Sequence, residues 1–173
     1  MKRPRGARAG ARPAPAVEVL IESARWKTRR GVRPLLRRAI AEAAALSTVA
    51  LSTRPVELAI VLTNDSAIRK LNRTWRGKDE PTNVLAFPAL QQASPQGSLG
   101  DLIIAYETLA REAKAEGKLF SHHLAHLAVH GFLHLCGYDH ETDRQAAAME
   151  RLEIAVLARL RIPNPYVAHA RGG

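Results

Sequence analysis

Three histidines in the C-terminal third of the chain place the strongest constraint on its fold. Residues 130–140 read HGFLHLCGYDH, so the histidines are His130, His134 and His140, and Gly137 precedes the last of them. In a helix, His130 and His134 lie one turn apart on the same face, and a glycine can end the helix and turn the chain back. The segment therefore predicts a helix and a return that bring the three imidazoles together. Three imidazoles leave one position of a tetrahedral Zn²⁺ open, which is typical of catalytic zinc sites.

The spacing of these histidines matches the HExxHxxGxxH frame of the metzincin proteases, with one difference. In those proteases the glutamate after the first histidine is the general base, and here that position is Gly131. Histidines also occur on helices as packed or surface residues, but three in register with a turn glycine favour a metal site. Cys136 points roughly across the helix from His134, so we interpret it as a buried small residue and not as a ligand. The sequence predicts a metzincin-like zinc helix without the peptidase base.

Three blocks of the sequence resemble one family. Residues 130–140 resemble the HGxLHLxGYDH signature of the YbeY endoribonucleases, and residues 75–88, WRGKDEPTNVLAFP, resemble that family's second signature. Residues 100–104, GDLII, are similar to a third and weaker one. The resemblance covers residues 16–167. It implies a zinc-dependent, single-strand-specific endoribonuclease of the bacterial cytoplasm, which acts in ribosomal RNA maturation, including the 3′ end of 16S rRNA, and in ribosome quality control.

Length and composition are those of one globular domain. The chain has 173 residues, of which 46% are hydrophobic, and can bury a substantial core. No apolar run reaches the roughly 20 residues that span a bilayer. The single cysteine excludes an intramolecular disulfide, and we expect no disulfide partner. The first residues lack the features of a signal or transit peptide, so we expect a cytoplasmic protein with no membrane partner.

The chain is strongly basic, with a formal net charge of +10. Residues 1–15 hold five basic residues and no acid, and in the remainder 21 basic residues face 16 acidic ones. The excess charge is thus shared between both parts and favours polyanionic partners. We interpret residues 1–15 as a disordered basic arm, residues 16–167 as the endoribonuclease domain and residues 168–173 as a flexible tail. The partners expected from charge and resemblance are single-stranded or ribosomal RNA and the small ribosomal subunit or its assembly factors.

Hydrophobic patterning predicts strands and helices in alternation. Strands are expected at residues 17–21, 56–62, 83–87 and 102–105. Helices are expected at residues 34–46, from 64 to about 75, after 105 as far as Gly117, from Ser121 through the histidines, and from Thr142 to about 161. Asn64, Asp65 and Ser66 are capping residues for the second of these helices, Ser121 can cap the fourth, and Thr142 and Gln145 form a capping-box pattern for the last. The predicted fold is a single α+β domain with a small mixed β-sheet packed by about five helices, and the resemblance implies the same fold.

Other polar residues lie near the histidines in sequence. Asp139 and Glu141 flank the third one, where a carboxylate can fix the tautomer of a ligand imidazole or act as a general base. Asp139 can also cap the local turn. His126, one turn ahead of the pair, can be a substitute ligand, a proton shuttle or a cleft wall, and we favour the wall or a hydrogen bond to the site. His122 and His123 are expected to be solvated residues of the first helical turn.

The block at residues 75–88 supplies groups that can bind phosphate. Arg76 and Lys78 are cations beside a turn, and Asn83 adds an amide. A guanidinium fits phosphate oxygens with two hydrogen bonds and stabilises charge that develops in a transition state. The resemblance implies that Arg76 lines the catalytic cleft. We expect Trp75 in the core, and not as a surface for base stacking, because it continues the apolar spacing of its helix; Asp101 is expected at the sheet edge near the cleft.

These patterns together predict an endoribonuclease with one Zn²⁺ on the three histidines. The metal would activate water or polarise a phosphate oxygen, Arg76 would bind the scissile phosphodiester, and Asp139 is the candidate base. Either water or the neighbouring 2′-hydroxyl can be the attacking group. Two other classes stay open: a metalloprotease-like hydrolase, which explains the metal frame, and a non-catalytic ribosome assembly factor with structural zinc, which explains the charge.

Overall fold

The computed structural model describes residues 13–48, 56–90 and 97–167. Its elements follow in the order β1 (Ala16–Ile21), α1 (Ala24–Lys27), α2 (Val32–Leu46), β2 (Glu57–Thr63), α3 (Asp65–Arg76), β3 (Val84–Pro88), β4 (Ser98–Ala105), α4 (Tyr106–Ala115), α5 (Phe120–Leu135) and α6 (Asp143–Arg159). Most of the predicted arm and the whole predicted tail lie outside the described residues. Among the residues that are described, no helix is both long and apolar enough to cross a bilayer.

The four strands form one mixed sheet with the order β1-β2-β4-β3. The strands β1, β2 and β4 are parallel, and β3 is antiparallel to β4. The middle strand β2 and the second half of β4, residues 102–105, are nearly continuous apolar runs, as expected for strands covered on both faces. The predicted α+β class with a small mixed sheet is confirmed. Because β3 is last in the order, one of its edges has no neighbouring strand among the described residues.

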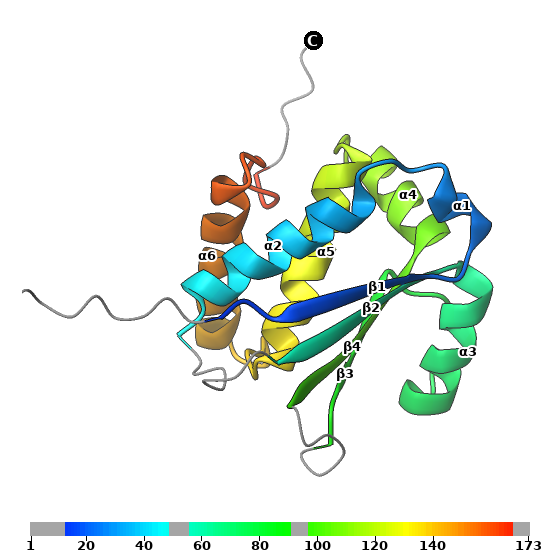
Figure 1. The fold of residues 1–173 in the computed structure, drawn as a ribbon, viewed down its shortest axis with the longest axis horizontal. Helices are drawn as coiled ribbons and strands as arrows, with labels where there is room; N and C mark the ends of the chain where they lie inside the picture. Colours follow the sequence, from blue (N-terminus) through cyan, green and yellow to red (C-terminus); the bar gives the residue numbers. More distant parts are fainter. Residues whose placement is uncertain (1–12, 49–55, 91–96, 168–173) are drawn as a thin grey trace, which may run out of the picture.

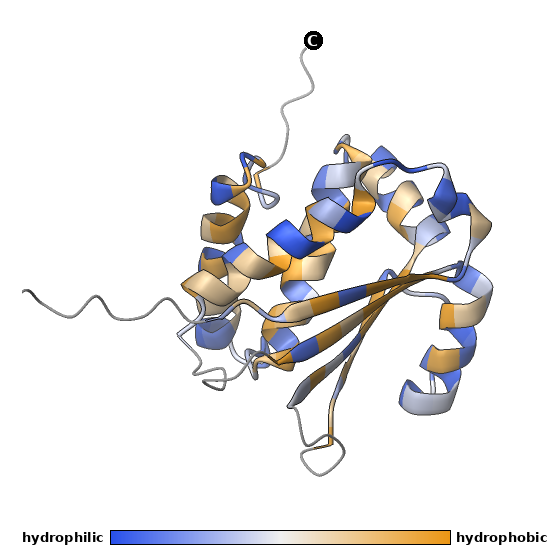
Figure 2. Cartoon of the chain, viewed as in Figure 1, coloured by the Kyte–Doolittle hydropathy of each residue, from blue (hydrophilic) through white to orange (hydrophobic). Residues whose placement is uncertain are grey.

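Helices cover the two faces of the sheet unequally. Figure 1 shows α2, α5 and α6 together on one face, while α3 lies on the other. The larger cluster of buried side chains lies between the sheet and α2, α5 and α6, and a smaller one lies under α3. Figure 2 shows that the strands between these helices are mostly apolar. The central position of α5 in the larger cluster fixes the side chains that it carries.

Helix α3 begins as predicted but ends differently. The Asn64 side chain accepts a hydrogen bond from the backbone N–H of Ala67 at 2.9 Å, which confirms the predicted cap. Ile68 is fully buried against the face of the sheet that α3 covers. The core position predicted for Trp75 is wrong, because its side chain is 69% exposed. The last turn of α3 extends past the part of the sheet that Ile68 covers, so the apolar stripe continues into solvent.

Helices α5 and α6 start by different means. The predicted cap at Ser121 is wrong, since α5 already begins at Phe120 and no side chain caps it. The predicted capping box of α6 is confirmed: Thr142 Oγ1 accepts from Gln145 N–H at 3.2 Å, and Gln145 Oε1 accepts from Thr142 N–H at 3.1 Å. This box places the N-cap of α6 two residues after the last histidine. Helix α6 then packs alongside α5.

Candidate metal centre

Helix α5 and the turn that follows it gather the three predicted histidines. His130 and His134 lie one turn apart near the end of α5, and Gly137 then adopts a φ of +93°, a conformation that favours glycine. The chain turns back and brings His140 to the pair, with its ring centroid 5.9 Å from that of His130 and 5.0 Å from that of His134. One nitrogen from each of the three imidazoles lies within 4.8 Å of the others. This arrangement can hold a metal ion.

The hydrogen bonds of the two helical histidines leave their Nε2 atoms free for a metal. His134 Nδ1 lies 3.0 Å from the carbonyl oxygen of Tyr138, which only accepts hydrogen bonds, so Nδ1 carries the proton. His130 Nδ1 donates in the same way to Glu153 Oε1 at 2.6 Å. The two unprotonated Nε2 atoms then lie 3.1 Å apart. Lone pairs at that distance repel each other. A metal cation bound by both nitrogens would remove this repulsion.

Charge and burial keep His134 in the form that binds metal. Burial lowers the pKa of His134, and the neighbouring His130 and His140 lower it further. A neutral imidazole is the ligating form, and three nitrogen donors with an open fourth position suit Zn²⁺. The donor set therefore fits the predicted metal.

A buried carboxylate, Glu153, supports this site from α6. It is fully buried; Oε1 accepts from His130, and Oε2 accepts from His126 Nε2 at 2.9 Å and from the Tyr166 hydroxyl. Burial alone raises the pKa of Glu153, but the hydrogen bonds from His126, His130 and Tyr166 outweigh it and lower the pKa to about 2. Glu153 is therefore a carboxylate that holds the ring of His130 in the metal-binding tautomer.

Neither Glu153 nor Tyr166 is among the residues predicted from the sequence. A signal for Glu153 does exist: it lies four residues after Met149 and three before Val156, two buried residues of α6. An acid on the apolar stripe of a helix needs a buried partner. The sequence before it offers a run of histidines as partners. Tyr166 has no comparable signal, because it lies in an irregular segment beyond α6.

The histidines that precede His130 on α5 are not all exposed to solvent. His126 lines the cleft and contacts Glu153, and it does not belong to the metal cluster. The exposed position predicted for His123 is wrong: it is 4% exposed, and its Nε2 lies 2.7 Å from Glu112 Oε2. The first turns of α5 pack against α4, which buries this ring. Glu112 also accepts a hydrogen bond from Asn83 Nδ2 at 3.0 Å, which ties β3 to the pair.

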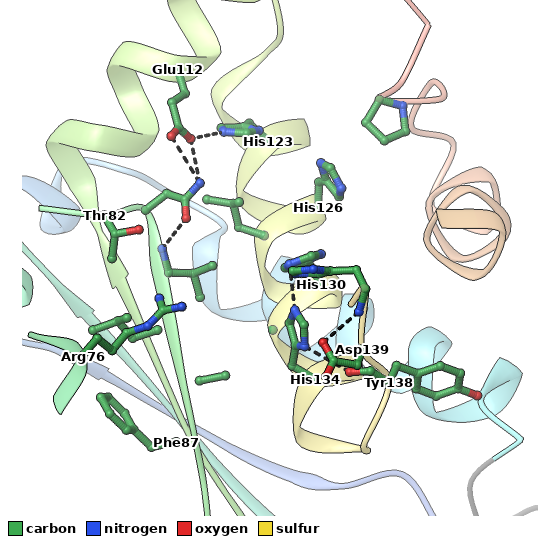
Figure 3. A pocket seen from close by; sticks show the side chains of 18 of the residues that line it. Arg76, Thr82, Phe87, Glu112, His123, His126, His130, His134, Tyr138 and Asp139 are labelled. Carbon is green, nitrogen blue, oxygen red and sulfur yellow. Dashed lines mark hydrogen bonds and ion pairs between the residues drawn. The ribbon is translucent and has the colours of Figure 1, made fainter. Parts of the chain in front are cut away.

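The metal centre lies in a cleft of about 1180 Å³ between β3 and α5. Arg76 and Phe87 lie on one side of the cleft and the histidines on the other (Figure 3). Asn83 and Asp139 also line it. Of the other predicted cleft residues, Lys78 and Glu141 are exposed and lie outside the lining of the cleft. Asp101 is exposed and pairs with Phe87 at the β3–β4 edge.

Asp139 caps the turn after α5. Its Oδ1 accepts from the backbone N–H of His140 at 2.8 Å. The imidazoles of His130 and His134 donate instead to Glu153 and to the carbonyl of Tyr138, respectively. Cys136 is half-buried and outside the metal cluster, and burial raises the pKa of its thiol to about 11. It packs against the core, as predicted, but it is less buried than predicted.

Gly131 marks a close approach between α5 and the sheet. A Cβ atom at this position would lie 2.8 Å from Leu102 Cδ2 and 3.4 Å from Val84 Cγ2. The glutamate of the protease frame would therefore need the end of the buried Leu102 side chain of β4 to shift. Glycine at this position agrees with the close packing of the helix on the sheet.

Comparisons with known proteins agree on one family. A family model described as "Endoribonuclease YbeY" matches residues 21–161. A protein named Endoribonuclease YbeY from Nitrobacter hamburgensis is 53% identical over 163 residues, which cover 91% of this chain and 85% of that protein. One of the same name from Rhodopseudomonas palustris is 52% identical over 162 residues, with 91% and 93% covered. A solution structure from Thermotoga maritima shares the fold, with a TM-score of 0.52 and 21% identity over 91% of this chain and 100% of that one.

Proposed function

The chain belongs to the YbeY endoribonuclease family, and on this basis we propose that it is a zinc-dependent endoribonuclease that cleaves single-stranded RNA. The observation that carries the proposal is a cleft in which a three-histidine metal centre faces an arginine. Among the described residues no carboxylate forms an ion pair with Arg76, so its guanidinium is free to bind phosphate. The names of the relatives support an RNA substrate.

The proposal extends to the biological setting. We place the chain in the cytoplasm, in maturation of ribosomal RNA, including the 3′ end of 16S rRNA, and in ribosome quality control. The small ribosomal subunit or its assembly factors would be its partners. These points follow from the family, and the net charge of +10 agrees with a polyanionic substrate.

In the proposed mechanism each residue of the cleft has a separate task. His130, His134 and His140 would hold Zn²⁺, which supplies Lewis-acid chemistry toward water or a phosphate oxygen. Glu153 and the Tyr138 carbonyl hold two of these rings in the ligating tautomer. Arg76 binds the scissile phosphodiester and offsets the charge that develops on it. Asp139, which faces the same cleft, is the proposed general base for the attacking hydroxyl of water or of the ribose.

A cleavage assay with a defined RNA tests the function. The substrate carries one single-stranded segment between two duplex arms, and we expect cuts only in the single strand. Removal of metal with a chelator should abolish cleavage, and added Zn²⁺ should restore it, with metal content measured in each sample. Cleavage by protein shown to be free of metal would contradict the zinc dependence. Chelator-sensitive hydrolysis of casein, without RNA cleavage, would favour the metalloprotease alternative.

Arg76 gives a test that separates cleavage from metal binding. We expect Arg76→Glu to lower the RNA cleavage rate at least ~100-fold, because an anion replaces the cation beside the phosphate. Arg76→Lys should fall between this variant and the wild type, since it keeps the charge and loses the planar fork. Zinc content and thermal stability should stay near wild type, because the side chain is exposed.

Lys70→Glu is the matched control for Arg76→Glu. It makes the same charge reversal on an exposed position of α3 that does not line the cleft. We expect only a small loss of cleavage, which added salt should reduce further. Equal losses in the two variants would show that net charge matters and that Arg76 has no specific role.

A further inference from the structure

The two tryptophans of the chain lie in opposite environments. Trp26 is fully buried, whereas the side chain of Trp75 is 69% exposed at the end of α3. The ring of Phe87, on β3, contacts Trp75 edge-on, with ring centroids 6.2 Å apart and planes at 65°. An edge contact of this kind supports the indole and leaves much of its surface open. We call Trp75 and Phe87 the aromatic platform.

The aromatic platform belongs to the cleft that contains the metal centre. Both of its residues line this cleft, and Trp75 directly precedes Arg76 in the chain. Figure 3 shows Phe87 near Arg76, across the cleft from His134. The cleft has a volume of about 1180 Å³, which is larger than common small-molecule pockets of about 300–1,000 Å³. The cleft thus has room for a length of polymer that contacts both the metal centre and the platform.

The charge around the platform selects the kind of partner. Two arginines of α3, Arg69 and Arg73, lie within ion-pair distance of Asp79, at 3.0 and 3.9 Å. Arg76 and Lys78 have no such partner among the described residues. An open indole that shares the cleft with the unpaired cation of Arg76 matches a group that is flat and apolar and carries an anion close by. A nucleotide has both features, and single-strand binding proteins join aromatic side chains to basic grooves in this way.

We propose that the aromatic platform is the site on which one base of the RNA strand stacks, next to the phosphate that Arg76 binds. The proposal rests on the proposed function and adds a nucleobase subsite to it. Stacking on an indole does not depend on base identity, because every base has a π-face. It requires that face to be accessible, and so an unpaired or splayed base. The platform would thereby contribute to the choice of single-stranded over paired RNA.

Binding of oligonucleotides tests the platform without cleavage. The probe is a short 2′-O-methyl oligoribonucleotide with a fluorescent end label, and a set of copies carries one abasic residue at each position in turn. We expect Trp75→Ala to weaken binding of the intact oligonucleotide on the order of 10-fold. For the wild type, at least one abasic position should weaken binding by a similar factor. For Trp75→Ala, the same abasic position should have almost no further effect, since the stacking partner is already lost.

Two further variants guard against indirect effects. Trp75→Phe should restore most of the affinity, because a smaller ring can still stack. Leu119→Ala removes another exposed apolar side chain, 63% exposed and outside the cleft, and should bind like the wild type. Tryptophan emission gives an independent readout: the oligonucleotide should quench Trp75, and the buried Trp26 should remain as an unquenched background.

The outcomes separate this proposal from the proposed function. If Trp75→Ala binds all oligonucleotides as the wild type does, the platform has no part in RNA binding and the proposal is overturned; a protein partner would then be the better occupant. Zinc-dependent cleavage would still stand in that case. If the wild type neither binds nor cleaves RNA, the proposed function fails together with this subsite.

Discussion

Alanine in place of His134 is expected to prevent zinc binding and to abolish RNA cleavage. In the proposed site this side chain would be one of three protein ligands from the described residues, and loss of a hydrogen-bonding partner of a ligand already weakens metal binding about 10–100-fold. Loss of the ligand itself should weaken metal binding by more than ~100-fold. Metal analysis of the purified protein should fall from about one zinc per chain to a small fraction, and cleavage should fall to background. His130→Ala and His140→Ala should behave alike.

Thermal unfolding gives a second readout for the same variant. Zinc that binds only the folded wild-type chain stabilises it by about 2.7 kcal/mol at a concentration of 100 times Kd. Added zinc should therefore raise the Tm of the wild type and leave that of His134→Ala nearly unchanged. His122→Ala is the matched control, because His122 is on the same helix and does not line the cleft. Full zinc occupancy in the His140→Ala variant would show that the cage is wrongly assigned.

The clustering of His130, His134 and His140 could be predicted from the sequence because it depends on local backbone geometry. The pair His130 and His134 depends only on the helical repeat, and the return of His140 depends on Gly137, which adopts a positive φ three residues after His134. The capping box at Thr142 and the cap at Asn64 are equally local. Each of these features involves residues close in sequence, so the pattern alone specifies the geometry.

The carboxylates that pair with the histidines of α5 could not be predicted from local sequence patterns. Glu153 lies 23 residues after His130 and meets it only because α6 packs against α5. Likewise, Glu112 meets His123 only because α4 packs against α5. Helical spacing shows that Glu153 shares a stripe with Met149 and Val156, but it does not show which side chain faces that stripe.

The prediction for Trp75 failed for the opposite reason. The apolar spacing of α3 was extended beyond the part of the sheet against which the helix packs. The spacing of Trp75 from Ile68 is that of one apolar face, and the face is real as far as the sheet extends. Where the sheet ends, the same face becomes surface, and no periodicity in α3 encodes that limit. Arg76 also reaches the cleft through the packing of α3 and β3, and only the family resemblance placed it there in advance.

Replacement of Glu153 by alanine is expected to be the most destabilising single change near the site. It leaves the donors of His126, His130 and Tyr166 without their shared acceptor. Tyr166 is 45% exposed and can turn to water, whereas an unpaired group that stays buried costs ~1–3 kcal/mol. We expect a loss of ~3–5 kcal/mol in the free energy of unfolding, measured by urea denaturation of the zinc-free protein. Glu150→Ala removes an exposed glutamate from the same helix and should change it by less than ~0.5 kcal/mol.

Glu153→Gln keeps the shape of the side chain and tests its role in ligation. The carboxylate accepts from both His126 and His130, whereas an amide has one accepting and one donating end. If the donating end faces His130, that ring must move its proton to Nε2, which blocks the atom aimed at the metal. Zinc affinity, measured by competition with a chelator, should therefore fall about 10–100-fold while the fold is retained. Affinity equal to that of Glu150→Gln would show that Glu153 stabilises the fold and does not position the ligand.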